Sequence, residues 1–305
     1  MDLLKFPTAI TRLIQSYLQH RTFHVTVNAD RSDTRKIANG TPQGSILGPV
    51  LFLIYVNDIP KPGRPLIAQY ADDTAAYFRA GDLPTLAAHL QRTLDALLAY
   101  FHRWRIKINP LKTEAVLFTH RSLRSASDHP LRIGLQPLPW QTTAKFLGVT
   151  LDRRLIFSRH IDNVTRTARA AMAVLYPLIT RSSKLSTPIK VRLAAAYVRP
   201  ILTYAAPAWT GTASDTNLLR LQVIQNKCLR MALNLPPWTP IRDLHKEAKI
   251  PHLGDTILRM TDKFYEKTKT SDNPYIRALG DYTPETLPYT PRHKTPKHRI
   301  FQRDA

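Results

Sequence analysis

Two aspartates, Asp72 and Asp73, stand side by side in the largely apolar run IAQYADDTAAYF, residues 67–78. Like charges this close repel each other, and each carboxylate loses favourable hydration when it leaves water. The pair is therefore expected to be exposed in a turn or to be neutralised by cations. The flanks Leu66–Tyr70 and Ala75–Phe78 are typical of short strands, so one interpretation is an ordinary hairpin with a polar tip. The alternative is a hairpin tip that binds metal ions.

The overall charge points to a polyanionic partner. The chain has 305 residues, 43% of them apolar, and a formal net charge of +22. Such a chain can bury a core, and an excess of positive charge favours nucleic acid as the partner. An anionic membrane surface is the other interpretation, but no lipidation motif and no basic amphipathic helix at the end of the chain supports it.

Other classes of protein are disfavoured by short stretches of sequence. The longest apolar run, Val50–Val56, is too short to span a bilayer, and the N-terminus lacks the layout of a signal peptide. We therefore expect an intracellular protein, nuclear or cytoplasmic and not secreted. Cys228 is the single cysteine, which excludes an internal disulfide and a thiolate zinc finger. His20 and His24 have helical metal-pair spacing but no third ligand nearby, so we interpret them as surface residues.

The elements around the aspartates predict a mixed fold. Apolar positions between residues 3 and 17 predict an amphipathic helix, and FHVTVN, residues 23–28, alternates like a strand. The segment Ile46–Ile59 is apolar on all sides, which predicts a helix buried under a sheet. Asp82 is expected to cap a long helix that ends near Phe101 and covers the sheet.

Strand-like segments continue to about residue 152, and the sequence pattern then becomes helical. They are RIKIN (105–109), EAVLF (114–118), LRIGL (131–135) and AKFLGVTLD (144–152). From Phe157 onward only helices are predicted, with starts near Ser186, Ser214 and Thr239. The fold class is therefore α+β, with a boundary near residue 155. Residues 151–200 carry ten Lys and Arg against two Asp, which indicates either a phosphate-facing surface or a solvated helical face.

Four motifs in one order carry a family resemblance: GTPQGSILGPVLFLIYVNDI, YADDTA, NPLKTEAVLF and KFLGVTLD. Together they resemble the palm of a reverse transcriptase, most closely the jockey-like enzymes of non-LTR retrotransposons. VRPILTYAAPAW, LQVIQNKCLRMALNLPPW and LHKEAKIPHLGDTI resemble the thumb and following region, so the resemblance extends to about residue 277. It implies a partial palm over residues 1–155, an antiparallel sheet with helices on one face. A helical thumb follows over 156–270, and then a basic, Pro-rich tail over 271–305 that we expect to be disordered when free.

The resemblance implies the chemistry of an RNA-directed DNA polymerase. Two Mg²⁺ ions, or Mn²⁺ in their place, would join a primer 3′-hydroxyl to an incoming nucleotide. Asp72 would be a metal ligand, and Asp73 would support the site or bind metal directly. Lys112 matches the lysine near the triphosphate, where it offsets charge or donates a proton to the leaving group. Taken alone, it would be an ordinary surface lysine.

Three further segments would contact nucleotide, template or primer. Tyr70 and Ala71, just before the two aspartates, would contact the nucleotide or the template. The loop of Gly40, Pro42, Gln43 and Gly44 resembles the one beside the incoming nucleotide and template, where backbone N–H groups at a helix start favour phosphate. An ordinary Gly/Pro turn is the alternative. Phe146, Leu147 and Gly148 resemble the primer grip, and a buried strand with a glycine bulge is the alternative there.

One part of the family pattern is not found in this sequence. The family places a further catalytic aspartate on an earlier strand, in a pattern of aromatic-Asp-x-Val, and the chain aligns from just beyond that strand. Asp2, Asp30 and Asp33 are not positioned to replace it. We therefore expect the fingers region and the first catalytic strand to be absent, a sheet edge to be left unpaired, and polymerase activity of this chain alone to be low or nil.

The implied partners are an RNA template, a DNA primer or target and deoxynucleoside triphosphates, with an endonuclease domain upstream in an intact element. The alternative hypothesis is a non-catalytic nucleic-acid-binding remnant that uses the basic helical region and tail. A group II intron-type or telomerase-like enzyme is a third possibility, which the segment RPILTYAAPAW disfavours by resemblance.

Overall fold

The computed structural model describes residues 6–42, 44–63, 65–119 and 128–279. The chain forms two compact units. The first contains the residues up to Ile108 together with Arg132–Gln136, and the second contains Asn109–Leu131 and the residues from Pro137 onward. The division by compactness therefore falls near residue 108, whereas the expected boundary near residue 155 rests on the change from mixed elements to helices alone and stays a prediction.

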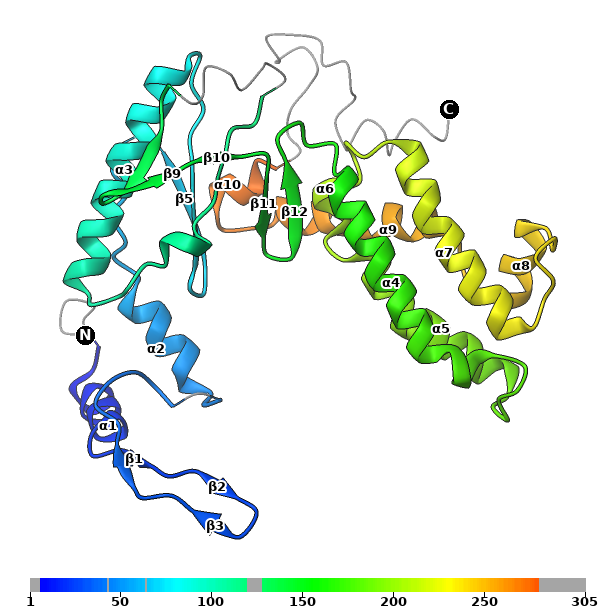
Figure 1. The fold of residues 1–305 in the computed structure, drawn as a ribbon, viewed down its shortest axis with the longest axis horizontal. Helices are drawn as coiled ribbons and strands as arrows, with labels where there is room; N and C mark the ends of the chain where they lie inside the picture. Colours follow the sequence, from blue (N-terminus) through cyan, green and yellow to red (C-terminus); the bar gives the residue numbers. More distant parts are fainter. Residues whose placement is uncertain (1–5, 43, 64, 120–127, 280–305) are drawn as a thin grey trace. The chain divides into compact units, whose positions relative to one another are not determined.

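The described residues of the first unit form three helices and three two-stranded ladders (Figure 1). The helices are α1 (Thr8–Leu18), α2 (Leu47–Tyr55) and α3 (Leu83–Arg103). The strands up to residue 77 are β1 (Thr22–Phe23), β2 (Thr26–Val27), β3 (Asp30–Arg31), β4 (Arg35–Lys36), β5 (Leu66–Tyr70) and β6 (Asp73–Tyr77). β8 (Leu131–Ile133) pairs with β9 (Gln136–Leu138) where the chain passes between the two units.

The second unit begins with short strands and continues in helices alone. It contains the 3-10 turn η2 (Pro110–Lys112) and the strands β7 (Ala115–Val116), β10 (Trp140–Gln141), β11 (Thr143–Phe146) and β12 (Val149–Asp152). The longer helices are α4 (Ser158–Ile179), α5 (Thr187–Thr203), α7 (Asp215–Leu233), α8 (Ile241–Ala248) and α9 (Leu253–Lys269). Two single-turn helices, α6 (Ala206–Trp209) and α10 (Pro274–Arg277), complete it. The mixed fold and the helical second half agree with the predicted α+β class.

The described strands form six separate two-stranded ladders: four are antiparallel, one, β7 with β10, is parallel, and the sixth pairs β8 with β9. The expected continuous palm sheet is therefore not formed by these strands. RIKIN, predicted as a strand, is irregular, and its last residue Asn109 caps η2 by accepting the N–H of Leu111 at 3.0 Å. An asparagine that binds the backbone two residues on favours a turn over a strand, and that local bond explains the difference.

The helix predicted over Ile46–Ile59 forms as α2, but the prediction of all-round burial is wrong. Among the described residues of α2 only Gly48 is buried, and Val50 and Leu53 are 50% and 54% exposed. The reason is that each described ladder is only two strands wide, so no wide sheet is present among them to bury this helix. Ser45 accepts the N–H of Gly48 at 2.9 Å, so its hydroxyl caps the start of this helix.

The helical core is built on α4, α5 and α7, which pack against one another (Figure 1). Apolar side chains at helical spacing on α4, among them Ile161, Ala168 and Leu175, are 4% exposed or less. Trp209 is fully buried in the same cluster.

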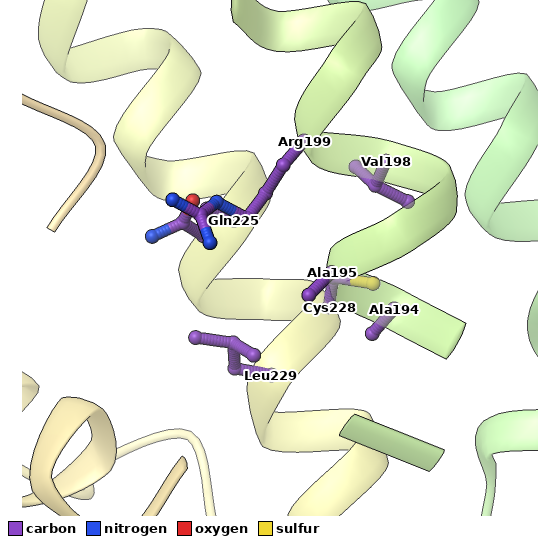
Figure 2. A pocket seen from close by; sticks show the side chains of 7 residues that line it. All are labelled: Ala194, Ala195, Val198, Arg199, Gln225, Cys228 and Leu229. Atoms are coloured by element: carbon purple, nitrogen blue, oxygen red, sulfur yellow. The ribbon is translucent and has the colours of Figure 1, made fainter. Parts of the chain in front are cut away.

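Figure 2 shows a small cavity between α5 and α7, which Arg199 and Gln225 line together with apolar side chains. Burial lowers the pKa of Arg199, and nearby Arg259 lowers it further.

The joint between β12 and α4 depends on one carboxylate. Asp152 accepts the backbone N–H groups of Arg154 at 3.1 Å, Ile156 at 3.2 Å and Phe157 at 2.6 Å. These bonds hold a connection in which Phe157 has φ of 56°, a value that costs free energy for a residue with a β-carbon. The carboxylate thereby fixes where α4 leaves the hairpin.

We predict that Asp152→Ala lowers the free energy of unfolding by about 2 kcal/mol, because three N–H groups lose a charged acceptor. Asp162→Ala, which removes an exposed ion pair with Arg220, is the matched control and should cost at most about 0.5 kcal/mol. Urea denaturation followed by circular dichroism measures both. Equal losses in the two variants would contradict the role given to Asp152.

A second prediction concerns pH. His160 is 3% exposed, and burial lowers its pKa. Its Nδ1 accepts the N–H of Thr150 at 3.3 Å, which favours the neutral ring. The folded protein therefore binds fewer protons here than the unfolded chain, so stability should be full above pH of about 6.5 and should fall as the pH is lowered through that value.

The expected slope from one such histidine is at most about 1.4 kcal/mol per pH unit. His160→Phe should reduce the loss of unfolding free energy between pH 7 and pH 5, although the variant is less stable at both. Part of the dependence should remain, because burial also lowers the pKa of His245. An unchanged dependence in His160→Phe would contradict the assignment.

Candidate active site

The two aspartates lie at the tip of the β5–β6 hairpin, as the sequence predicts. The strands pair antiparallel over five residue pairs that end with Tyr70 opposite Asp73. The turn consists of Ala71 and Asp72, and Ala71 has φ of 52°. A two-residue turn leaves little freedom to the side chains at its tip. Both carboxylates are exposed, and so are Tyr70 and Ala71.

The environment of the carboxylates is open and acidic. Within the described residues, neither Asp72 nor Asp73 has a hydrogen-bond or ion-pair partner. Carboxylate oxygens are the ligands that Mg²⁺ and Mn²⁺ prefer. The described part of the chain holds no group of three or more His, Cys, Asp or Glu side chains that could bind a metal ion. The donor chemistry of a carboxylate thus fits a hard divalent cation, and the hairpin tip carries two such side chains.

The hairpin is supported by the helix that follows it. Asp82 caps α3 by accepting the N–H of Thr85 at 2.8 Å, as the sequence predicts. Phe78, just after β6, contacts the ring of His89 on α3 with 4.6 Å between ring centroids. The predicted capping residue therefore also fixes the helix against which the hairpin rests.

An aromatic cluster joins α2 to the other end of α3. Tyr55 and Trp104 meet edge to face at 4.9 Å, and the hydroxyl of Tyr55 donates to the carbonyl of Trp104. Tyr100 donates to Asp58 at 2.7 Å, and burial together with this bond raises the pKa of Tyr100. The C-terminal end of α2 is thereby anchored to the end of α3, and the loop before α2 lies at the other end of that helix.

That loop holds the glycines predicted to approach a nucleotide. Gly40 and Gly44 have φ of 78° and 84°, and a β-carbon on either would meet no atom within 4 Å. Positive φ values explain why glycine stands at both positions, and the space beside them is open. Pro42 lies between them and accepts the N–H of Ser45 at 3.2 Å. Gln43 lies outside the described residues.

Lys112 and the predicted primer grip belong to the second unit, whereas the hairpin and the glycine loop belong to the first. Lys112 is exposed at the end of η2. Two residues on, Glu114 accepts the backbone N–H of Lys145 at 3.0 Å. The structure therefore connects the segment of Lys112 with strand β11, which leads into the primer-grip motif.

The primer-grip motif forms the turn between β11 and β12. Phe146 pairs with Val149, so Leu147 and Gly148 make a two-residue turn. Their φ values of 45° and 82° are both positive, which is typical of the tightest hairpin turns. The alternative of a buried strand with a bulge is not what forms, since both turn residues are exposed.

A cleft of about 600 Å³ lies beside this turn, between β11–β12 and helices α4 and α5. Lys145, Arg166 and Tyr204 are among the residues that line it. Arg166 donates to Asn163 at 2.6 Å, and Asn163 donates to Thr150 at 3.3 Å. The sequence interpretation missed these residues, although Lys145 and Tyr204 stand within the motifs KFLGVTLD and VRPILTYAAPAW.

The ten Lys and Arg residues within residues 151–200 differ in exposure, and two of them, Arg153 and Arg199, are half-buried. Seven side chains are exposed: Arg154, Arg159, Arg166, Arg169, Arg181, Lys184 and Arg192. Lys190 is buried instead, and its ammonium group donates to the carbonyls of Thr180 at 2.8 Å and Ser183 at 3.1 Å, at the end of α4. Most of the predicted positive surface therefore exists, but Lys190 has a structural role.

No helix among the described residues is long and apolar enough to cross a membrane.

Comparisons with known proteins agree with this arrangement. Residues 2–151 match the family model "Reverse transcriptase (RNA-dependent DNA polymerase)". The RNA-directed DNA polymerase from mobile element jockey of Drosophila melanogaster is 33% identical over 283 residues, which is 90% of this chain and 30% of that protein. The corresponding jockey protein of Drosophila funebris is 34% identical over 277 residues, 88% of this chain and 30% of that protein.

The probable RNA-directed DNA polymerase from transposon X-element of Drosophila melanogaster is 32% identical over 283 residues, which is 91% of this chain and 31% of that protein. The chain thus spans about a third of the length of these relatives. The relatives share similarity across both units, and the hairpin with its two aspartates lies within the residues that match the family model. The chain therefore belongs to the reverse transcriptases of non-LTR retrotransposons, a family of RNA-directed DNA polymerases.

Proposed function

We propose that this chain is the part of an RNA-directed DNA polymerase that supplies two metal-binding carboxylates and the contacts to primer and template. The observation that carries the proposal is the β5–β6 hairpin, whose tip presents Asp72 and Asp73 to solvent within the residues that match the family. In this proposal the first unit and the β7–β12 region form the palm, and the helices from α4 onward form the thumb.

The proposed reaction joins the 3′-oxygen of a primer to the α-phosphate of a deoxynucleoside triphosphate, breaks the bond between the α- and β-phosphates and releases pyrophosphate. Asp72 and Asp73 would hold Mg²⁺, which when bound stabilises the attacking and leaving oxygens. Lys112 would offset the negative charge of the triphosphate or donate a proton to the leaving group. The N–H groups near Gly40 and Gly44 would contact the nucleotide or the template, since open space beside both glycines permits close approach.

The carboxylate count limits what this chain can do alone. Holding two ions at a fixed separation requires a further carboxylate that bridges them, and the described residues bring no third acidic side chain to the hairpin. We therefore propose that the 305-residue chain binds substrates but incorporates little or no nucleotide. The alternative function, nucleic-acid binding without catalysis, is favoured by the cleft lined by Lys145 and Arg166.

Primer extension on an RNA template with Mg²⁺ or Mn²⁺ separates these functions. We expect binding of the primer–template with incorporation near background. Incorporation that Asp72→Ala abolishes would show that the chain is catalytically complete, which would contradict the proposed dependence on a further carboxylate. Failure to bind an RNA–DNA hybrid would contradict both functions.

A prediction on the metal site needs no activity. We expect Mn²⁺ to broaden the backbone NMR signals of the β5–β6 turn, and Asp72→Asn or Asp73→Asn to weaken Mn²⁺ binding about tenfold, since each removes one of two charged ligands. Asp30→Asn is a matched control, because Asp30 follows the β2–β3 turn as Asp73 follows the β5–β6 turn. The same weakening in Asp30→Asn would show nonspecific binding.

A prediction on the cleft concerns salt. Lys145→Ala and Arg166→Ala should each weaken binding of an RNA–DNA hybrid and should each reduce the slope of log Kd against log salt by about 1, the signature of one lost phosphate contact. Arg242→Ala is the control, since the side chain of Arg242 is 93% exposed and does not line the cleft. Slopes that stay equal to that of the unaltered protein would exclude phosphate contacts in the cleft.

A further inference from the structure

Tyr204 connects the end of α5 to the turn between β11 and β12. Its hydroxyl donates to the backbone carbonyl of Leu147 at 2.9 Å, a bond between residues 57 positions apart in the chain. A β-carbon placed on Gly148 would lie 3.1 Å from the Cε1 atom of Tyr204. The ring therefore lies against Gly148 while the hydroxyl holds Leu147, so one side chain contacts both residues of the turn.

The turn needs such support because its backbone conformation is unfavourable. Leu147 has φ of 45°, a value that a residue with a β-carbon rarely adopts. Gly148 has φ of 82°, and glycine adopts this value without a steric penalty. A leucine in the left-handed region persists only where surrounding contacts hold it, and the bond from Tyr204 to its carbonyl is such a contact.

Tyr204 is itself held from the helical core. The indole N–H of Trp209 donates to the carbonyl of Tyr204 at 2.9 Å, and Trp209 is fully buried. Ala205, between the two, has φ of 50°, so the chain reverses sharply after α5. The phenol is therefore fixed at its backbone end by the core, although its side chain is half exposed.

The turn and Tyr204 also shape the cleft. Gly148 and Tyr204 both line it, as do Lys145 and Arg166. The position of the turn relative to α4 and α5 therefore sets how far Lys145 on β11 lies from Arg166 on α4. A turn released from Tyr204 would change both the wall of the cleft and the spacing of its positive charges.

We propose that Tyr204 is a positioning residue for primer binding: it locks the Leu147–Gly148 turn against the end of α5, so that the turn meets the primer end in one conformation. This inference rests on the proposed function, in which the turn is the primer grip. Tyr204 acts through the turn backbone and is not assigned a contact with reacting atoms.

Tyr204→Phe tests the lock, because it removes the hydroxyl and keeps the ring. Tyr197→Phe is the matched control: Tyr197 lies on α5, which Tyr204 follows directly, and both residues are 54% exposed. The hydroxyl of Tyr197 has no hydrogen-bond partner among the described residues. Three quantities are measured on the whole chain: hydrogen exchange of the backbone amides of residues 143–152, the melting temperature, and the affinity for RNA–DNA hybrids by fluorescence anisotropy.

The hybrids differ only at the primer end, which is recessed in one and blunt in the other. We expect Tyr204→Phe to speed amide exchange in the turn and to weaken binding of the recessed hybrid about fivefold, a typical effect of one lost hydrogen bond. Binding of the blunt hybrid and the melting temperature should change little. A purely structural role would weaken both hybrids alike, and Tyr197→Phe should alter none of these quantities.

The outcomes distinguish failure of the role given to Tyr204 from failure of the proposed function on which that role rests. If the unaltered chain does not bind the hybrids, the proposed function fails and the role of Tyr204 in primer binding fails with it. If the unaltered chain prefers the recessed hybrid and Tyr204→Phe keeps that preference, the inference alone is overturned. Equal exchange rates in the turn of both proteins would show that the bond to Leu147 does not hold it.

A double-variant cycle tests the ring contact. Gly148→Ala suffers from positive φ in any background, but its close contact with the ring exists only while Tyr204 is present. Gly148→Ala should therefore weaken recessed-hybrid binding more in the unaltered chain than in Tyr204→Ala. Equal effects in the two backgrounds would exclude coupling between the ring and the turn.

Discussion

Two carboxylates adjacent in a chain must remain hydrated or be neutralised by cations, and the β5–β6 hairpin satisfies this constraint by placing both at its tip. The tip is exposed, and neither Asp72 nor Asp73 has a partner among the described residues. Helix α3 supports the hairpin from behind through Phe78 and His89. A rigid support with an open acidic end suits cation binding better than it suits stability, because exposed like charges contribute nothing favourable to folding.

In the second unit, the turn between β11 and β12 has an unfavourable backbone conformation and lies beside the cleft lined by Lys145 and Arg166. Leu147 and Gly148 both have positive φ values, and Tyr204 and Trp209 connect this turn to the helical core. On the other side, Asp152 fixes the start of α4 through three backbone N–H groups. The hairpin is thus restrained at its turn and at its exit, and both restraints lead into the core of α4, α5 and α7.

Much of the fold could be predicted because its signals are local. Asp82 and Ser214 cap α3 and α7 through bonds to residues three positions on, and such spacing can be read from the sequence. The hairpin of Asp72 follows from the short strand-like segments on either side of the two aspartates. RIKIN was misassigned because one side-chain bond from Asn109 outweighs its strand-like pattern. The burial of α2 was misassigned because composition indicates how apolar a helix is but not what covers it.

The candidate site was less predictable, because its remaining parts depend on contacts between distant residues. Nothing local to Tyr204 indicates a bond to Leu147, 57 residues away, and nothing local to Lys190 distinguishes it from the exposed arginines around it. Family motifs predict roles for Asp72, Lys112 and the β11–β12 turn, since a motif records such contacts without explaining them. The structure adds how each segment is held. Strand pairing holds the hairpin tip, the Asn109 side chain caps the η2 turn, and the hydroxyl of Tyr204 bonds to the β11–β12 turn. A change at Tyr204 would therefore leave the carboxylates of the other unit intact, so under the proposed function we expect loss of primer contacts and loss of metal binding to be separable defects.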